Sequence, residues 1–200
     1  MFKIYNFKKL TSTNEKAKNF EENSVIIANE QTKGKGRFKR SWSSSKGGIY
    51  LSIVLKNYNP QYLTFIAAIS AQKAIKDTYN LKTIIKWPND LIHKKKKICG
   101  ILTEIKEKAI VGIGINTNNK IPISLKSKAT SLNNIISKKI NNKLIIKKLL
   151  ENFKKYLKLL ESQKSKISEG LENSRNFQSN GNYNKIIKDW KKNSFLGEKI

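Results

Sequence analysis

The sequence predicts an α+β protein in which a mixed β-sheet is backed by helices. Two observations indicate this class. Apolar runs of strand length recur along the first part of the chain, and two longer stretches, 61–79 and 140–160, carry apolar residues at helical spacing. The chain has 200 residues, 38% of them hydrophobic, which is enough for a sizeable core. The single cysteine, Cys99, excludes an intrachain disulfide framework, and no apolar run approaches the roughly 18 residues of a membrane-spanning helix.

Three strands and one long loop are predicted before the first long helix. Apolar or alternating runs predict strands at residues 2–7, 24–30 and 49–55. Ser12 and Glu15 have the spacing of a capping box, which predicts a short helix that runs to about Phe20. The stretch from Thr32 to Gly48 is polar and holds four glycines. Long polar stretches in compact domains are usually functional or disordered, so we expect a loop here.

Strands and helices continue to alternate after the first long helix. A short strand at 83–87 is stopped by Pro88, and two apolar runs flank Lys94–Lys97 in a way that predicts a hairpin with a lysine-rich turn. Residues 109–115 predict a strand whose glycines allow another group to approach closely. Beyond residue 160 we expect a loop or weak helix over 161–182 and one more helix over 184–192.

The formal net charge of +27 is the kind of excess that phosphate-binding proteins carry. However, 38 of the 41 basic residues are lysines and only 3 are arginines, and isoleucine (28) and asparagine (23) are also abundant. An AT-rich coding sequence produces this composition, and proteins that recognise phosphates and bases usually favour arginine. The lysines are also spread along the chain. The charge therefore favours compositional bias over a dedicated nucleic-acid site.

The loop from Gln31 to Trp42 is the first candidate site. Its glycines free the backbone to wrap around an anion, and four basic residues surround them, namely Lys35, Arg37, Lys39 and Arg40. Two of the three arginines of the protein lie here, and Trp42 offers a ring for stacking. The loop is not a Walker loop, because Gly-Lys-Ser/Thr is missing. A phosphate-binding loop and a flexible, solvated loop both remain open.

A second group of candidates follows the strand at 83–87. The run Lys86–Asp90 has the composition of an ordinary turn, but a carboxylate at a strand end near a basic loop is also a good polar anchor. Lys97 begins a strand, and alternation can turn its side chain inward. Cys99 is more typical of a small core residue than of a nucleophile. With one histidine, His93, the sequence offers no metal-ligand cluster and no Ser/His/Asp triad.

Together these residues resemble the catalytic domain of the biotin protein ligases over about residues 2–160. The resemblance rests on six motifs in the order of that family: Ser12–Asn14 (STN), Gln31–Trp42 (QTKGKGRFKRSW), Lys86–Asp90 (KWPND), Lys97–Glu104 (KICGILTE), Ile113–Asn116 (IGIN) and Ala129–Leu132 (ATSL). Two positions depart from the pattern. Lys35 replaces an arginine and loses its bidentate fork, and Lys39 replaces a glycine, which matters only if that position needs a positive φ.

The resemblance implies the fold of the biotin and lipoate ligases, which is similar to the class II synthetases, and an ATP-dependent ligase. It implies activation of biotin as biotinyl-5′-AMP and transfer to a lysine of a carrier domain. Implied biotin-binding residues are Ser12, Thr13, Asn14, Gln31, Gly34, Lys35, Arg37, Lys97 and Gly100. Implied ATP-binding residues are Arg37, Arg40, Trp42, Lys97 and Asn116. Arg37, Lys97 and Asp90 are implied to be catalytic, with Asp90 orienting Lys97 or receiving a proton. Mg²⁺ would accompany ATP, held by phosphates and water rather than by dedicated protein ligands.

The resemblance also implies a domain organisation and partners. We expect a catalytic domain over 1–192 and, over 193–200, a stub of an SH3-like domain whose remainder is missing, with an exposed, unpaired strand end at Phe195–Ile200. No helix-turn-helix domain is expected before the first strand, and hence no specific DNA binding. The expected acceptor is the biotin carrier domain of acetyl-CoA carboxylase or a related enzyme, in the cytoplasm and without a membrane, and a homodimer is compatible with this family. A lipoate or octanoyl ligase, a basic nucleic-acid-binding protein and an inactive relative remain as alternatives.

Overall fold

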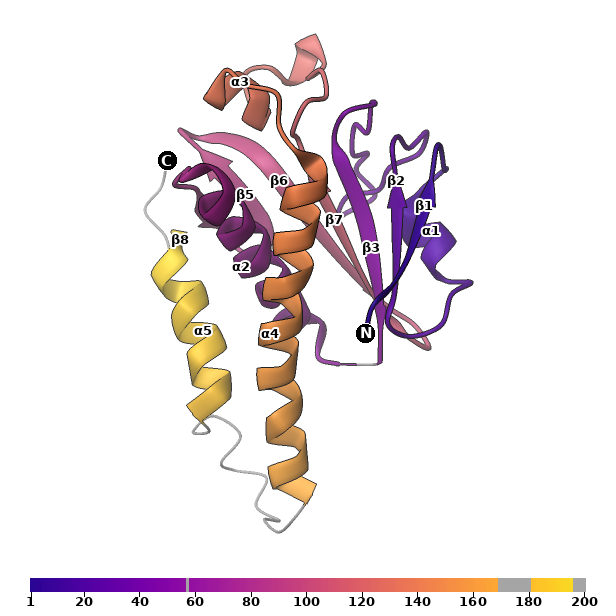
Figure 1. Cartoon of the computed structure of the whole chain (residues 1–200), viewed down its shortest axis with the longest axis vertical. Coiled ribbons are helices and arrows are strands. Elements are labelled where there is room, and N and C mark those ends of the chain that lie inside the picture. The colour runs from indigo at the N-terminus through magenta and orange to yellow at the C-terminus, as the bar shows by residue number, and fades with distance from the viewer. Residues whose placement is uncertain (57, 169–180, 196–200) are drawn as a thin grey trace.

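A mixed β-sheet forms the centre of the computed structural model, which describes residues 1–56, 58–168 and 181–195 (Figure 1). Within these residues the sheet has eight strands, in the order β1 (Lys3–Phe7), β2 (Ser24–Ala28), β3 (Ile49–Leu55), β7 (Ala109–Ile115), β6 (Lys96–Ile105), β5 (Asp90–His93), β4 (Ile84–Lys86) and β8 (Ser194–Phe195). The outer pairs β1–β2 and β4–β8 are parallel, and all other neighbours are antiparallel. The predicted mixed sheet is therefore confirmed.

Helices cover the two faces of this sheet unequally. Three long helices, α2 (Pro60–Tyr79), α4 (Asn142–Ser168) and α5 (Gly181–Asn193), lie on one face and bury the main hydrophobic core against it (Figure 1). The short helix α1 (Thr13–Ala17) packs against β2 and β3 over a much smaller core on the other face. Two further short helices, the 3-10 helix η1 (Ile123–Leu125) and α3 (Leu132–Ile136), lie between β7 and α4. Much of the second face of the sheet is therefore not covered by a helix.

The strand alternation explains this division. In β3 and β7, residues such as Leu51, Ile53, Val111 and Ile113 belong to the main core beneath the long helices. Successive side chains of a strand point to opposite faces, so their neighbours point away from the long helices. At the centre of the sheet those neighbours are Ser52, Gly112 and Gly114, while Val54 and Ile110 form the smaller core beneath α1. The second face of the central strands is therefore shallow and partly polar.

Helix α2 has the predicted boundaries, and the residues at its two ends explain where it begins and ends. The Asn59 side chain accepts a hydrogen bond from the Gln61 amide, Pro60 occupies the first turn, and Asn80 ends the helix in the left-handed conformation. The helix is buried on more than the predicted face, because the sheet lies on one side of it and α4 and α5 on another. Phe65 of α2 stacks on Trp190 of α5 with 4.4 Å between ring centroids, which joins the last helix to the body.

Two sequence-based expectations are corrected. Ser12 precedes α1 but makes no side-chain capping bond, and the helix ends at Ala17 rather than near Phe20. The Glu15 carboxylate contacts Lys18 and Lys35. Residues 161–168 belong to α4, which agrees with the helical alternative expected for 161–182, and 169–180 lie outside the described residues. Ser194 and Phe195 are not unpaired, since they add to the sheet beside β4, and 196–200 lie outside the described residues. The division into domains at residue 193 stays a prediction.

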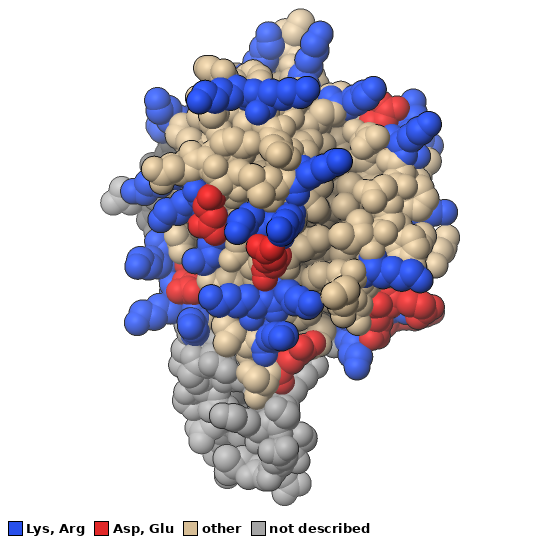
Figure 2. All heavy atoms as spheres, viewed as in Figure 1, with Lys and Arg blue, Asp and Glu red and all other residues tan. Residues whose placement is uncertain are grey.

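Lysines are distributed over the whole described surface in the view of Figure 2, across α2 and α4 as well as the sheet edges, rather than gathered in one patch. This distribution agrees with compositional bias as the main source of the charge. Among the described residues, no helix is both long and apolar enough to cross a membrane.

We expect Trp190→Ala to lower the free energy of unfolding by about 3–5 kcal/mol, because it empties a buried site and removes the stack with Phe65. Urea unfolding followed by circular dichroism measures this change. Lys188→Ala, at an exposed position of the same helix, is the matched control and should stay within about 0.5 kcal/mol of the unchanged protein. Equal stability of the two variants would contradict the role of this contact.

Candidate functional site

Three glycines leave the second face of the sheet bare at its centre. The register places Gly100 of β6 beside Gly114 of β7, and Gly112 of β7 beside Ser52 of β3. A Cβ atom on Gly100 would come within 2.9 Å of the Trp42 ring, and one on Gly114 would overlap the same indole. A Cβ on Gly112 would overlap the side chain of Asn14. The predicted close approach to this strand is therefore confirmed, and the groups that approach are Trp42 and Asn14.

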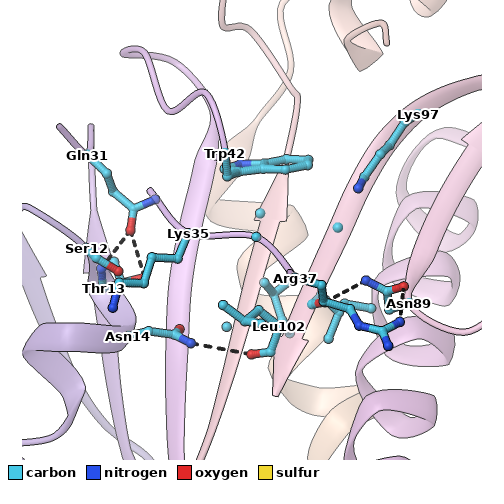
Figure 3. A pocket seen from close by; sticks show the side chains of 16 residues that line it. Ser12, Thr13, Asn14, Gln31, Lys35, Arg37, Trp42, Asn89, Lys97 and Leu102 are labelled. Atoms are coloured by element: carbon cyan, nitrogen blue, oxygen red, sulfur yellow. Dashed lines mark hydrogen bonds between the residues drawn. The ribbon is translucent and has the colours of Figure 1, made fainter. Parts of the chain in front are cut away.

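A cavity opens over this bare floor, and we call it the central cavity (Figure 3). Counting its opening to solvent, its empty space is about 450 Å³. The start of α1, the loop after β2, and the strands β6 and β7 form its walls. Nine predicted site residues line it: Ser12, Thr13, Asn14, Gln31, Lys35, Arg37, Trp42, Lys97 and Gly100. The structure thus brings together residues that are far apart in the sequence.

One wall of the central cavity is a hydrogen-bonded polar network. The Gln31 Oε1 atom accepts from the Thr13 amide at 2.6 Å and from the Thr13 hydroxyl at 3.1 Å. The Gln31 Nε2 atom donates to Ser44 Oγ at 2.8 Å, and Ser44 Oγ donates to the Trp42 carbonyl at 3.1 Å. This network links the first turn of α1 to the segment that carries Trp42. It fixes α1 and the segment that carries Trp42 relative to each other.

The opposite wall carries the basic residues. Lys97 Nζ lies 2.8 Å from Asp90 Oδ1 and 5.0 Å from the centre of the Trp42 ring, so this cation contacts both a carboxylate and an aromatic face. Arg37 donates to Asn89 Oδ1 at 3.2 Å, and Asn89 Nδ2 donates to the Ile101 carbonyl at 2.9 Å. Asp90 does not line the cavity itself and reaches it through Lys97. Residues of the predicted motifs at 86–90 and 97–104 therefore contact each other at this wall of the cavity.

The segment from Lys35 to Ser41 forms a small hairpin within the predicted loop. Lys35 pairs with Ser41, and the Gly36 amide donates to the Arg40 carbonyl at 2.8 Å. Phe38 (φ 54°) and Lys39 (φ 58°) occupy the tip with positive φ, as in a type I′ turn. Position 39 thus needs the conformation that glycine adopts without strain, and lysine there is strained.

Gly34 is the one predicted biotin-binding residue that lies behind the cavity wall. It is buried, and a Cβ atom there would overlap the Trp42 carbonyl and the Ser44 hydroxyl and come within 3.1 Å of Gln31 Nε2. The absence of a side chain at Gly34 therefore lets the two ends of the loop approach each other, and its part in biotin binding stays a prediction.

A second cavity lies beside the central one, and the remaining predicted ATP-binding residues line it. We call it the outer cavity; it is lined by Arg40, Ser41, Trp42, Ser43, Lys97, Asn116, Asn119, Ile121, Pro122, Leu125, Lys128 and Ala129. Trp42 and Lys97 belong to both cavities. The Asn116 side chain is buried and accepts from Asn119 Nδ2 at 3.1 Å. Arg40, Trp42, Lys97 and Asn116 therefore line one space, and binding of ATP there stays a prediction.

Lys35 is held at the rim of the central cavity by α1. Its ammonium pairs with the Glu15 carboxylate, which Lys18 also contacts at 2.6 Å. Glu15 accepts hydrogen bonds from Lys18, which has the larger effect, and from Lys35, and these lower the pKa of Glu15 to about 2. The hydrogen bond that Lys35 donates to Glu15 raises the pKa of Lys35. Because the pKa of Glu15 is lowered, its contribution to stability is present above about pH 4.5 and is lost as the pH falls toward 2. Lys35, which replaces the arginine of the family pattern, therefore forms an ion pair with Glu15 of α1.

Four residues of the site carry no role in the sequence analysis: Ser44, Ser52, Asn89 and Glu104. Ser52 is fully buried, and its Oγ atom lies 2.8 Å from Thr13 Oγ1 and 2.6 Å from Asn14 Oδ1. Asn14 also donates to Glu104 Oε2 at 2.6 Å. The available signal was a lone serine in the otherwise apolar strand at 49–55. Cys99, in contrast, is a buried core residue as predicted, and burial raises the pKa of its thiol.

The family model for the biotin/lipoate A/B protein ligases matches residues 5–118, more than half of the chain. The chain belongs to this family. It is similar to the bifunctional ligase/repressor BirA of Bacillus subtilis, with 38% identity over 152 residues that cover 68% of this chain and 46% of the relative. It is also similar to the biotin–[acetyl-CoA-carboxylase] ligase of Mycobacterium tuberculosis, with 30% identity over 118 residues that cover 54% of this chain and 44% of the relative.

Solved structures of the family agree with the fold. Biotin protein ligase from Aquifex aeolicus in complex with biotin and ATP superposes with a TM-score of 0.71 and 35% identity, covering 76% of this chain and 71% of that one. The Leishmania major enzyme in complex with biotinyl-5-AMP has a TM-score of 0.71 at 21% identity, over 98% of this chain and 85% of that one, and supports the fold alone. The predicted family and the α+β fold are therefore confirmed. The chain spans about half the length of the curated relatives named above.

We expect Lys39→Gly to stabilise the hairpin at 35–41 by about 1 kcal/mol, because glycine adopts positive φ without strain. Amide hydrogen exchange measures this directly: the Arg40 amide, which donates to the Arg37 carbonyl at 3.2 Å, should exchange about fivefold more slowly. Lys33→Gly is the matched control, since Lys33 is an exposed lysine of the same loop without positive φ. Faster exchange in Lys39→Gly than in the unchanged protein would contradict the strain at this turn.

Proposed function

We propose that this protein is an ATP-dependent biotin protein ligase, which forms biotinyl-5′-AMP and transfers biotin to a lysine of a carrier domain. The observation that carries the proposal is that the central and outer cavities share Trp42 and Lys97. A small acid in the first cavity and a nucleotide in the second would meet at the Lys97 ammonium. Family membership supports this assignment, as do the named relatives and the Aquifex complex with biotin and ATP.

In the first step, a biotin carboxylate oxygen attacks the α-phosphorus of ATP, and pyrophosphate leaves. Both reactants are anions, so the main tasks of the protein are to hold them together and to stabilise charge at phosphorus. Lys97 stands between the two cavities and would contact the carboxylate and the α-phosphate. Arg37 lines the central cavity, and its planar guanidinium suits a phosphate. Trp42 offers its ring to adenine, and Asn116 and Arg40 line the same space.

In the second step, a lysine amine of the carrier attacks the acyl carbon of the mixed anhydride, and AMP leaves. The attacking amine loses a proton, and a carboxylate near the reacting atoms can accept it. Asp90 lies 2.8 Å from Lys97 Nζ, which places it close to this point. Before ligands bind, the same contact holds Lys97 at the junction of the cavities. Asp90 thus orients Lys97 first and is positioned to receive the proton later.

The hairpin at 35–41 supports protection of the intermediate. A mixed anhydride hydrolyses in water, so the site must exclude water once the adenylate has formed. Arg37 lies in this hairpin and lines the central cavity, so its contact with the adenylate phosphate would hold the hairpin over the product.

The remaining parts of the proposal concern ions and partners. Mg²⁺ would enter as a companion of the ATP phosphates, held by phosphate oxygens and water. The acceptor is a biotin carrier domain of acetyl-CoA carboxylase or a related enzyme, in line with the name of the Mycobacterium relative. A homodimer, a cytoplasmic location and the stub of a further domain at 193–200 stay predictions.

The test is transfer of biotin to a purified carrier domain with ATP and Mg²⁺, alongside calorimetric titrations with biotin and with lipoate. We expect labelled carrier and binding of biotin but not lipoate. Lys97→Met should lower the rate at least about a hundredfold, because it removes the cation that stabilises charge at phosphorus. Lys96→Met changes the exposed neighbouring lysine and is the matched control. No labelling by the folded, unchanged protein would overturn the proposal, and selective binding of lipoate would favour the lipoate alternative.

Arg37→Ala should release more free biotinyl-5′-AMP into solution, because the hairpin loses its contact with the adenylate phosphate. Single-turnover reactions without carrier, separated by chromatography, measure the released and retained fractions. Lys33→Ala removes an exposed charge from the same loop and should leave retention unchanged. Equal retention in Arg37→Ala and the unchanged protein would argue against a closing role for this residue.

A further inference from the structure

Two of the cations that line the central cavity, Arg37 and Lys97, are held by adjacent residues. Asp90 Oδ1 lies 2.8 Å from Lys97 Nζ, and the preceding residue, Asn89, accepts a hydrogen bond from Arg37 Nη1 at 3.2 Å (Figure 3). Lys97 is therefore held by a carboxylate, whereas Arg37 is held by a neutral amide. Among the described residues, Arg37 forms no ion pair with an aspartate or a glutamate. No carboxylate of this part of the chain therefore compensates the charge of Arg37.

The orientation of the Asn89 amide is fixed by β6. Its Nδ2 atom donates to the Ile101 carbonyl at 2.9 Å, and its own backbone carbonyl accepts from the Ile101 amide at 2.9 Å. Because a carbonyl oxygen only accepts, the Nδ2 atom must face Ile101, and the Oδ1 atom is left to face Arg37. Asn89 is thus a hydrogen-bond acceptor that is anchored to a central strand of the sheet.

Arg37, in contrast, belongs to an exposed segment. It precedes the positive-φ tip of the hairpin at 35–41, where Phe38 and Lys39 are both exposed. Its guanidinium carbon lies 4.9 Å from the centre of the Phe38 ring, and the hydrogen bond to Asn89 joins the side chain to the body of the protein. A guanidinium has five N–H donors in one plane, so one bond to Asn89 leaves the others for a ligand. The contact therefore sets where the guanidinium lies without using up its donors.

A neutral partner suits an arginine that has to bind a phosphate. A carboxylate at position 89 would also hold Arg37, but it would repel the phosphate and compete with it for the guanidinium. An amide oxygen makes a hydrogen bond to a charged group and leaves the positive charge for the ligand. Lys97 differs in this respect, because its partner Asp90 is proposed above to accept a proton in the second step.

We propose that Asn89 is a positioning residue, which holds Arg37 at the central cavity through a neutral hydrogen bond and so keeps the charge of the guanidinium available for the adenylate phosphate. This inference rests on the proposed function, since it states how that site would keep its phosphate-binding arginine in place. Asn89 also lines the cavity, but the role assigned to it here is exerted through Arg37.

Asn89→Ala tests the contact with Arg37. The variant should release free biotinyl-5′-AMP about tenfold faster than the unchanged protein in single-turnover reactions without carrier, because Arg37 loses the partner that orients it. The double variant Arg37→Ala/Asn89→Ala should release it no faster than Arg37→Ala alone, since Asn89 acts through Arg37. Asn19→Ala changes an exposed asparagine and is the matched control, which should retain the adenylate as the unchanged protein does.

Asn89→Asp tests the need for a neutral partner. Aspartate cannot donate to the Ile101 carbonyl, and neither can alanine, so a comparison of the two variants reports the effect of the added carboxylate. This carboxylate should pair with Arg37 and keep the hairpin docked. The Gly36 amide, which donates to the Arg40 carbonyl at 2.8 Å, should then exchange with solvent more slowly than in Asn89→Ala. Release of biotinyl-5′-AMP should nevertheless be at least as fast as from Asn89→Ala, because the carboxylate opposes the phosphate.

The outcomes separate this inference from the proposed function. Failure of the folded, unchanged protein to form biotinyl-5′-AMP would overturn both. Adenylate formation with equal retention in Asn89→Ala and the unchanged protein, or additive losses in the double variant, would overturn the role of Asn89 and leave the ligase proposal standing. Restored retention in Asn89→Asp would show that docking alone matters and would overturn the need for a neutral partner. If Asn89→Ala does not fold, Asn89→Ser, whose side chain is too short to reach both partners, takes its place in the same comparisons.

Discussion

The register between β6 and β7 is the constraint on which the site depends. It places Gly100 beside Gly114, and the adjoining pairing of β6 with β5 brings Asn89 close enough to bond to Ile101. A slip of one residue would turn the glycines toward the long helices and put isoleucines beneath Trp42. The indole then could not lie on the sheet, and the two cavities that share it would not exist. The site is therefore a consequence of strand pairing rather than of any single loop.

The same face of the sheet shows how polar groups are kept in a buried place. Asn14, Ser52 and Thr13 lie on the face of the sheet opposite the main apolar core. Each of them has a hydrogen-bond partner in a neighbouring element. Leaving any of them unpaired would cost about 1–3 kcal/mol, so the network also ties α1 to β3 and β6. Function and stability are coupled here, because the groups proposed to recognise the ligand are also the groups that hold α1 in place.

Much of the fold follows from local sequence signals, and the exceptions have specific physical causes. Helix α2 begins at Pro60 and ends at Asn80 as its own residues dictate, and β3 and β7 are continuous apolar runs. The pairing of β8 with β4 could not be predicted, since it joins segments more than a hundred residues apart. The hairpin at 35–41 was hidden because Phe38 and Lys39 stand where Asn-Gly is the usual signal of a type I′ turn.

The candidate site shows the same division. Motif residues such as Arg37 and Lys97 could be named from the sequence because charged groups in a fixed pattern indicate chemistry directly. Ser52 and Glu104 could not, because each reaches the site through a hydrogen bond to Asn14, which is far from both in the sequence. The charge of the protein follows this rule as well. Lysines are spread over the surface in the view of Figure 2, whereas Lys97 has a defined place between the two cavities because it contacts Asp90 and the Trp42 ring.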